Sequence, residues 1–232
     1  MRMRKKKAEG RLLVISGPAG SGKGTVIKAL MDGDERFSYS VSATTRAPRP
    51  GEIDGVNYYF ITRSEFEKRI SRGRMVEYTE YCGNYYGTPA DELKKALKKG
   101  KIFILEIEVN GASNIRRQFP DATMIMIVPP DFRSLEARLR GRGTETEESI
   151  EKRLETSRKE LACLGLFDYI VINRDGAPEE ASETVRGIVS GMDSEKYRVS
   201  NNPDFAERFF GTGGQNVIEE SDLDIERKSE KL

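Results

Sequence analysis

One short glycine-rich stretch constrains the fold of this chain more than any other feature. Residues 17–25 read GPAGSGKGT, after the apolar run LLVIS and before VIKALM, whose apolar residues have helical spacing. Gly17, Gly22 and Lys23 fit G-x-x-x-x-G-K, a loop between a strand and a helix whose backbone N–H groups surround a phosphate. The strand before it and the helix after it favour this interpretation over a plain turn.

We expect Lys23 to reach the transferable phosphate, while the helix N-terminus adds positive potential. The residue after the lysine is usually a Ser or Thr that holds magnesium, but here it is Gly24, and Thr25 follows. Either Thr25 supplies this ligand, or water and nucleotide oxygens complete the Mg²⁺ octahedron. The residues expected to bind the triphosphate are Gly17, Pro18, Ala19, Gly20, Ser21, Gly22, Lys23, Gly24 and Thr25.

Beyond this loop, short β-rich runs alternate with amphipathic helical segments. The runs are LLVIS, KIFILEIE, TMIMIV and DYIVI, and their continuously apolar character is typical of parallel strands covered on both faces. Helix starts, 3.6-residue spacing and glycine stops mark the segments between them. The order predicts an α/β fold, a wound parallel sheet flanked by helices as in P-loop NTPases.

Residues 37–88 interrupt this alternation, because they are rich in Ser, Thr, Tyr, Gly and Arg around one helical segment, RSEFEKRIS. We interpret them as a small mixed β subdomain inserted into a main domain of residues 10–192. A basic arm, residues 1–9, precedes that domain. Residues 193–232 are polar with two aromatic patches and an acidic end, and we expect this tail to be mobile or to dock weakly.

Composition excludes several classes of function. The 232 residues carry 39 Lys plus Arg against 38 Asp plus Glu, so no global basic field indicates a nucleic-acid partner. No apolar stretch approaches the ~20 residues that cross a bilayer, and the N-terminus lacks the apolar segment of a secretory signal, so we expect a cytoplasmic protein without a membrane partner. With no histidine, chemistry must rely on Lys, Arg, carboxylates and the backbone.

A second anion site is indicated by Arg46 and Arg49, three residues apart among prolines that stiffen the backbone. Guanidinium groups held in this way grip a terminal phosphate bidentately, and the hydroxyls of Ser42, Tyr58 and Tyr86 are candidates to assist. Two arginines alone would favour a solvated basic loop. Their clustering with Ser, Thr and Tyr, in a chain that has a separate phosphate loop, favours the anion site.

Five motifs together resemble the guanylate kinases, which move the γ-phosphate of ATP onto GMP. In order along the chain they are GPAGSGKGT, SVSATTRAPRPGE..G..YYF, CGNYYGTP, LEIEVNGA and RGRGTETEESIEKRL, and the resemblance runs from about residue 10 to residue 190. It implies that the inserted subdomain binds GMP. Its phosphate would be held by Ser42, Arg46, Arg49, Tyr58 and Tyr86.

The resemblance also implies that Glu77 and Glu108 face the guanine base, with Thr88 on its carbonyl side. Guanine offers N–H donors at N1 and N2, and an ionised carboxylate only accepts, whereas adenine would set acceptor against acceptor. The family usually has Asp at the position of Glu108; the extra methylene moves the carboxylate about 1.5 Å and alters the pocket. Glu106, on the same strand face, is a candidate to order the waters of magnesium.

A third group of residues belongs to the segment that the resemblance makes a lid over ATP, about residues 138–160. Arg138 and Arg142 share a helix face, and Arg153 follows; all three would stabilise the charge of phosphoryl transfer. An exposed, salt-bridged helix is the alternative, since four glutamates lie nearby. The resemblance further implies that Asn173, in VINRD, touches adenine.

The sequence thus predicts an enzyme that transfers a phosphoryl group from Mg²⁺-bound ATP to GMP, and to dGMP, giving ADP and GDP. One alternative is a non-catalytic protein-binding module like those in scaffold proteins, which the intact Lys23 and lid arginines argue against. The other is a kinase of the same fold for AMP or a phosphorylated sugar, which Glu77 and Glu108 argue against.

Overall fold

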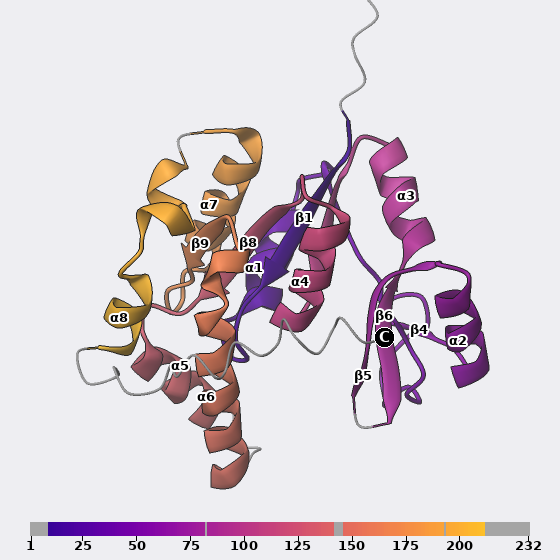
Figure 1. Ribbon diagram of the computed structural model, residues 1–232, viewed down its shortest axis with the longest axis horizontal. Helices are drawn as coiled ribbons and strands as arrows, with labels where there is room; N and C mark the ends of the chain where they lie inside the picture. The colour runs from indigo at the N-terminus through magenta and orange to yellow at the C-terminus, as the bar shows by residue number, and fades with distance from the viewer. Residues whose placement is uncertain (1–8, 82, 142–145, 193, 212–232) are drawn as a thin grey trace, which may run out of the picture. The chain divides into compact units, whose positions relative to one another are not determined.

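The computed structural model describes residues 9–81, 83–141, 146–192 and 194–211 (Figure 1). The chain divides into two compact units. Unit 1 holds the chain up to Ser16 together with Leu30–Ile125, and unit 2 holds Gly17–Ala29 and the chain from Met126 onward. Residues 1–8 of the predicted basic arm and residues 212–232 of the predicted tail lie outside the described residues.

A five-stranded sheet of order β2-β7-β1-β8-β9 runs through the fold, and the boundary between the units falls within β8. Both β1 and β2 pair in parallel with β7. Side chains of β1, β7 and β8 are buried almost throughout, which explains their continuously apolar sequences. The predicted wound parallel sheet is confirmed, with strands β1 (Arg11–Ser16), β2 (Phe37–Tyr39), β7 (Ile102–Glu106), β8 (Thr123–Val128) and β9 (Tyr169–Ile172).

The helices between these strands begin and end where local signals predict. The side chains of Asp131 and Thr146 cap α5 and α6 by accepting bonds from Ser134 N and Ser149 N, and left-handed Gly191 ends α7. Among the helices of the main domain, α4 was not predicted, because its first turn contains Asn-Gly, a poor helix start. The helices are α1 (Lys23–Met31), α3 (Ala90–Lys98), α4 (Val109–Gln118), α5 (Phe132–Arg140), α6 (Glu147–Ala162) and α7 (Pro178–Ser190).

Within unit 1, the inserted segment forms a second sheet of order β4-β3-β6-β5. Its strands are β3 (Ala43–Thr44), β4 (Tyr59–Phe60), β5 (Met75–Tyr81) and β6 (Asn84–Pro89), and α2 (Arg63–Ser71) lies beside the antiparallel pair β5 and β6 (Figure 1). The fully buried ring of Phe66 stacks on Tyr85, with 5.1 Å between ring centroids. The insertion starts later than residue 37, because β2 pairs with β7 of the main sheet.

Within unit 2, residues 194–211 are folded; they belong to the tail that we expected to be mobile or to dock weakly. They form two 3-10 helices, η2 (Glu195–Tyr197) and η3 (Val199–Asn201), and helix α8 (Phe205–Phe210). The aromatic residues that α8 contributes provide the apolar area for this packing, since Phe205 and Phe209 are buried and Phe209 meets Phe132 edge-on. Among the described helices, none combines the length and apolar character needed to span a membrane.

We expect Phe66→Ala to destabilise the fold by about 3–5 kcal/mol, because it leaves a cavity between α2 and the second sheet. Urea unfolding followed by circular dichroism measures this change. Val56→Ala, at a position that is 64% exposed in the same unit, is the matched control and should shift the midpoint little. Equal effects of the two substitutions would contradict the packing described for Phe66.

Candidate active site

The glycine-rich loop of unit 2 has a backbone that only glycine adopts readily. Gly17, Gly20 and Gly22 have φ values of 144°, 87° and 81°, in the region that L side chains avoid. A Cβ atom on Gly17 would lie 2.0 Å from the carbonyl oxygen of Ile127. The loop is therefore packed against the end of β8, and glycine is required for both space and conformation.

Lys23, the first residue of α1, places its positive charge at this loop. Its Nζ donates to the carbonyl oxygens of Gly17 and of Pro18, the latter at 3.1 Å. An ammonium group beside a turn of backbone N–H groups at a helix N-terminus is the arrangement that binds phosphate. Thr25, the candidate magnesium ligand, is exposed one residue beyond Gly24.

Two predicted nucleotide-binding residues far along the chain hold the same loop. Asn173 is 5% exposed and its Nδ2 donates to Ser21 O at 2.9 Å. Arg138 donates from Nη1 to Ser21 O at 3.3 Å and from Nη2 to Asn173 O at 2.8 Å. Its Nε also bonds Asp175 Oδ1 at 2.8 Å, a partner that the sequence analysis did not identify. These contacts fix the loop from outside.

Some polar atoms around the loop are buried without a hydrogen-bond partner in the described part of the chain. They are the side-chain oxygens of Ser16, Ser21 and Asn173. Buried polar atoms normally have partners, and a catalytic or binding role is one reason for an exception. Of the other lid arginines, Arg153 is half-buried on α6, while Arg142 lies outside the described residues.

In unit 1, the predicted phosphate-binding arginine Arg46 is held by Glu52, which the sequence analysis did not single out. The guanidinium donates to both carboxylate oxygens of Glu52, from Nη1 at 3.0 Å and Nη2 at 2.9 Å. Glu52 Oε2 also accepts from Arg49 N at 2.6 Å. The hydrogen bonds from Arg46 and Arg49 hold the pKa of Glu52 below its usual value. The only sequence signal for the role of Glu52 was its place in the motif, where Gly51 and Glu52 follow the two arginines.

The predicted tyrosines surround Arg46. Its guanidinium carbon lies 5.7 Å from the ring centre of Tyr58, and Tyr58 meets Tyr86 edge-on at 6.2 Å. A hydrogen bond with Tyr86 contributes to the raised pKa of Arg46, after the larger contribution of Glu52. Ser42 lies just before β3 and is half-buried. Arg46, Tyr58 and Tyr86 are therefore brought together, while the side chain of Arg49 is exposed.

The predicted guanine-binding residues also meet within unit 1. Glu77 and Thr88 are direct partners across β5 and β6, and Thr88 Oγ1 donates to Glu77 Oε1 at 3.0 Å. Burial raises the pKa of Glu77, and the negative charge of nearby Glu108, which precedes α4, raises it further. Thr88 is fully buried. The arrangement presents carboxylate acceptors beside a fixed hydroxyl.

Glu106, at the end of β7, has a partner that the sequence analysis missed. Tyr39 on β2 donates its hydroxyl to Glu106 Oε2 at 2.8 Å. Burial and the Glu106 carboxylate raise the pKa of Tyr39. The pairing of β2 with β7 brings the two residues together across 67 positions of sequence, and no local pattern predicts it.

A glycine-rich phosphate loop after the first strand of a wound parallel sheet, with a separate arginine and tyrosine cluster, defines a P-loop nucleotide-binding protein. The family model described as guanylate kinase matches residues 9–190. The chain belongs to the guanylate kinase family.

Similar proteins span nearly the same length. A guanylate kinase of Halalkalibacterium halodurans is 46% identical over 193 residues, covering 83% of this chain and 94% of the relative. One of Rubrobacter xylanophilus is 49% identical over 186 residues, covering 79% and 97%. The crystal structure of guanylate kinase from Anaplasma phagocytophilum is similar with a TM-score of 0.62 and 30% identity, covering 88% of this chain and 97% of that one.

The loop geometry gives a prediction with an internal control. Gly22→Ala puts a Cβ 2.4 Å from Asn173 Nδ2 at a φ of +81°, and such backbone strain costs about 1–3 kcal/mol. We expect its affinity for a nucleoside triphosphate to fall roughly tenfold or more. Gly24→Ala meets nothing within 4 Å and should bind normally. Calorimetric titration measures both; weaker binding by Gly24→Ala alone would contradict the described loop.

Proposed function

We propose that this protein is an enzyme that transfers the γ-phosphoryl group of ATP to GMP, giving ADP and GDP. The observation that carries the proposal is the group formed by Glu77, Thr88 and Glu108, in the same unit as the arginine and tyrosine cluster. Acceptors for a base and cations for a phosphate are what a nucleoside monophosphate requires. Family membership and the separate triphosphate loop support it.

The acceptor site is proposed to select guanine over adenine through its negatively charged hydrogen-bond acceptors. Ionised Glu77 and Glu108 accept from guanine N1 and N2, and the Thr88 hydroxyl, already oriented by Glu77, faces the base carbonyl. Arg46, Arg49, Tyr58, Tyr86 and Ser42 bind the phosphate, with Glu52 holding Arg46 in place. Since none of these contacts is assigned to the sugar 2′-hydroxyl, dGMP is proposed as a second acceptor.

The donor site is proposed to bind ATP through residues 17–25, with Asn173 close to adenine. Arg138, Arg142 and Arg153 would stabilise the negative charge that spreads over the transferred group. Transfer is in line and needs no strong base, because the oxygen of a monophosphate is already anionic. Closure of the lid segment over ATP excludes water that would otherwise hydrolyse it.

Magnesium is the proposed metal, and the oxygen donors present fit it. The exposed hydroxyl of Thr25 and the Glu106 carboxylate are the candidate ligands or water partners. Among the described residues, no three His, Cys, Asp or Glu side chains are grouped so that they could hold a metal ion. Mg²⁺ usually keeps several waters and binds through one or two carboxylates and substrate phosphates. When bound, Mg²⁺ neutralises phosphate charge. The balanced charge of the chain supports the absence of a nucleic-acid partner. A cytoplasmic location is part of the proposal.

A coupled assay of ADP release tests the reaction. We expect turnover with ATP and GMP, little with AMP, and a loss of at least roughly hundredfold in Lys23→Ala, because a preorganised cation at the transferred phosphate is removed. Lys28→Ala, an exposed lysine on the same helix, is the control and should remain active. Preference for AMP would refute the guanine assignment. Full activity of Lys23→Ala would refute the proposed donor site.

The raised pKa of Glu77 predicts a pH dependence. The unfolded chain gives up this proton first, so this carboxyl lowers the free energy of unfolding as pH rises from its unfolded pKa to its raised folded pKa. Guanine needs the ionised form of Glu77. As pH is lowered, GMP affinity should therefore begin to fall at a pH above the usual pKa of glutamate. Glu77→Gln should bind GMP roughly tenfold or more weakly and lack this acid limb.

Glu77→Gln also distinguishes the effect of Glu77 on stability from its effect on GMP binding. Because Glu77→Gln removes a buried charge, we expect it to unfold at a higher urea concentration than the natural chain at neutral pH. Titration of GMP between acid and neutral pH, beside urea unfolding of both proteins, measures the outcome. If the GMP affinity of Glu77→Gln still decreases on acidification as it does in the natural chain, another group causes that decrease.

A further inference from the structure

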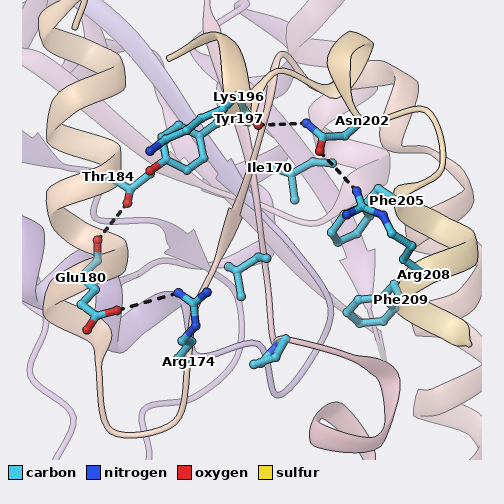
Figure 2. A pocket seen from close by; sticks show the side chains of 12 residues that line it. Ile170, Arg174, Glu180, Thr184, Lys196, Tyr197, Asn202, Phe205, Arg208 and Phe209 are labelled. Carbon is cyan, nitrogen blue, oxygen red and sulfur yellow. Dashed lines mark hydrogen bonds and ion pairs between the residues drawn. The ribbon is translucent and has the colours of Figure 1, made fainter. Parts of the chain in front are cut away.

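A cavity of about 500 Å³ lies within unit 2 (Figure 2); two of its lining residues, Ile172 and Arg174, flank Asn173 in the chain, and none of the predicted phosphate-binding residues lines it. Strand β9 forms its floor and α7 one wall, while the opposite wall comes from residues 194–211. The guanylate kinase model ends at residue 190. This wall is therefore made by a part of the chain that the family model does not cover. We call the cavity the C-terminal pocket.

The wall contributed by residues 194–211 is fixed by its own hydrogen bonds. Asn202 Nδ2 donates to Lys196 O at 3.0 Å and to Arg198 O at 2.8 Å, and Asn202 Oδ1 accepts from Arg208 Nη2 at 3.3 Å (Figure 2). Val199 N donates to Asp168 O at 3.0 Å, at the start of β9. The pocket is thus built before any ligand binds, which lowers the cost of binding.

The charge around the C-terminal pocket favours anions. Three cations, Arg174, Lys196 and Arg208, line it with one carboxylate, Glu180, and Arg208 also pairs with Asp204, its Nε lying 3.0 Å from Oδ2. Arg174 and Glu180 are 3.8 Å apart, at the limit of an ion pair, and both are largely exposed. The hydrogen bond from Lys196, with further contributions from Thr184 and the charge of Arg174, lowers the pKa of Tyr197, which indicates positive potential.

The floor of the C-terminal pocket is apolar. Ile170 is buried, Ile172 is 36% exposed, and Phe205 and Phe209 of α8 complete this side. Cations above an apolar floor suit a ligand with one flat, apolar part and one anionic part. Ligand sites of this kind commonly measure about 300–1,000 Å³.

We propose that the C-terminal pocket binds a phosphorylated ring compound of mononucleotide size, at a site separate from those for ATP and GMP. The ring lies on Ile172 and Phe209, and the phosphate meets Lys196, Arg208 and Arg174. This inference does not rest on the proposed function, because none of these residues belongs to the phosphate-transfer groups.

The test uses the full chain with ADP and GMP in excess, so that the proposed active site is filled. The probe is 1-naphthyl phosphate, followed by its fluorescence anisotropy, with inorganic phosphate and 1-naphthol titrated separately by calorimetry. We expect 1-naphthyl phosphate to bind roughly tenfold or more tightly than either fragment, because each fragment uses only one part of the pocket. The double variant Lys196→Gln, Arg208→Gln should weaken the probe by a similar factor.

Matched variants distinguish the pocket from general attraction to a charged surface. Lys152→Gln removes an exposed lysine on α6 and should leave probe affinity within about twofold. Ile172→Ser should weaken the probe but not inorganic phosphate, and circular dichroism verifies that each variant is folded. The proposal is overturned by no measurable binding, by unchanged binding in the double variant, or by loss of binding in Lys23→Ala, which would place the probe at the phosphate loop.

Discussion

The close approach of Gly17 to the carbonyl oxygen of Ile127 is the constraint on which the donor site depends. At this point β1 has ended, and residues 17–22 lead to α1 with no room for a side chain at Gly17. The Lys23 ammonium group bonds the carbonyl oxygens of the loop residues Gly17 and Pro18. Asn173 and Arg138 then bind Ser21 O. A rigid loop of this kind loses little entropy when a phosphate binds.

The acceptor site uses opposite charges for different purposes. Arg46 is partly neutralised by Glu52, which fixes the guanidinium plane instead of leaving it in solvent. Glu77, by contrast, accepts a hydrogen bond from the Thr88 hydroxyl and is held where burial disfavours its charge. A buried acceptor of that kind gains most when a ligand brings N–H donors. Stability given up at Glu77 is therefore consistent with a binding role.

Much of this site was visible in the sequence because its residues belong to short motifs. Lys23 follows a fixed glycine spacing, and Arg46 and Arg49 stand three apart, so local patterns predict both anion sites. The partners Glu52, Tyr39 and Asp175 were not predicted, since their roles arise from the turn after Pro50, from strand pairing, and from a contact across the fold. The C-terminal pocket was not predicted for a similar reason: the aromatic patches of the tail were visible in the sequence, but no local pattern shows where α8 buries Phe205 and Phe209.

The sequence by itself determined the periodic features: alternating apolar strands and amphipathic helices, the glycines of the loop, and the kinds of side chain available for charge. These follow from steric and hydrophobic preferences that act over a few residues. Only the tertiary structure decided that β2 joins the main sheet beside β7, that Glu77 faces Thr88, and that residues 194–211 pack on β9. Such pairings depend on contacts between distant segments, whose free energy no local pattern records.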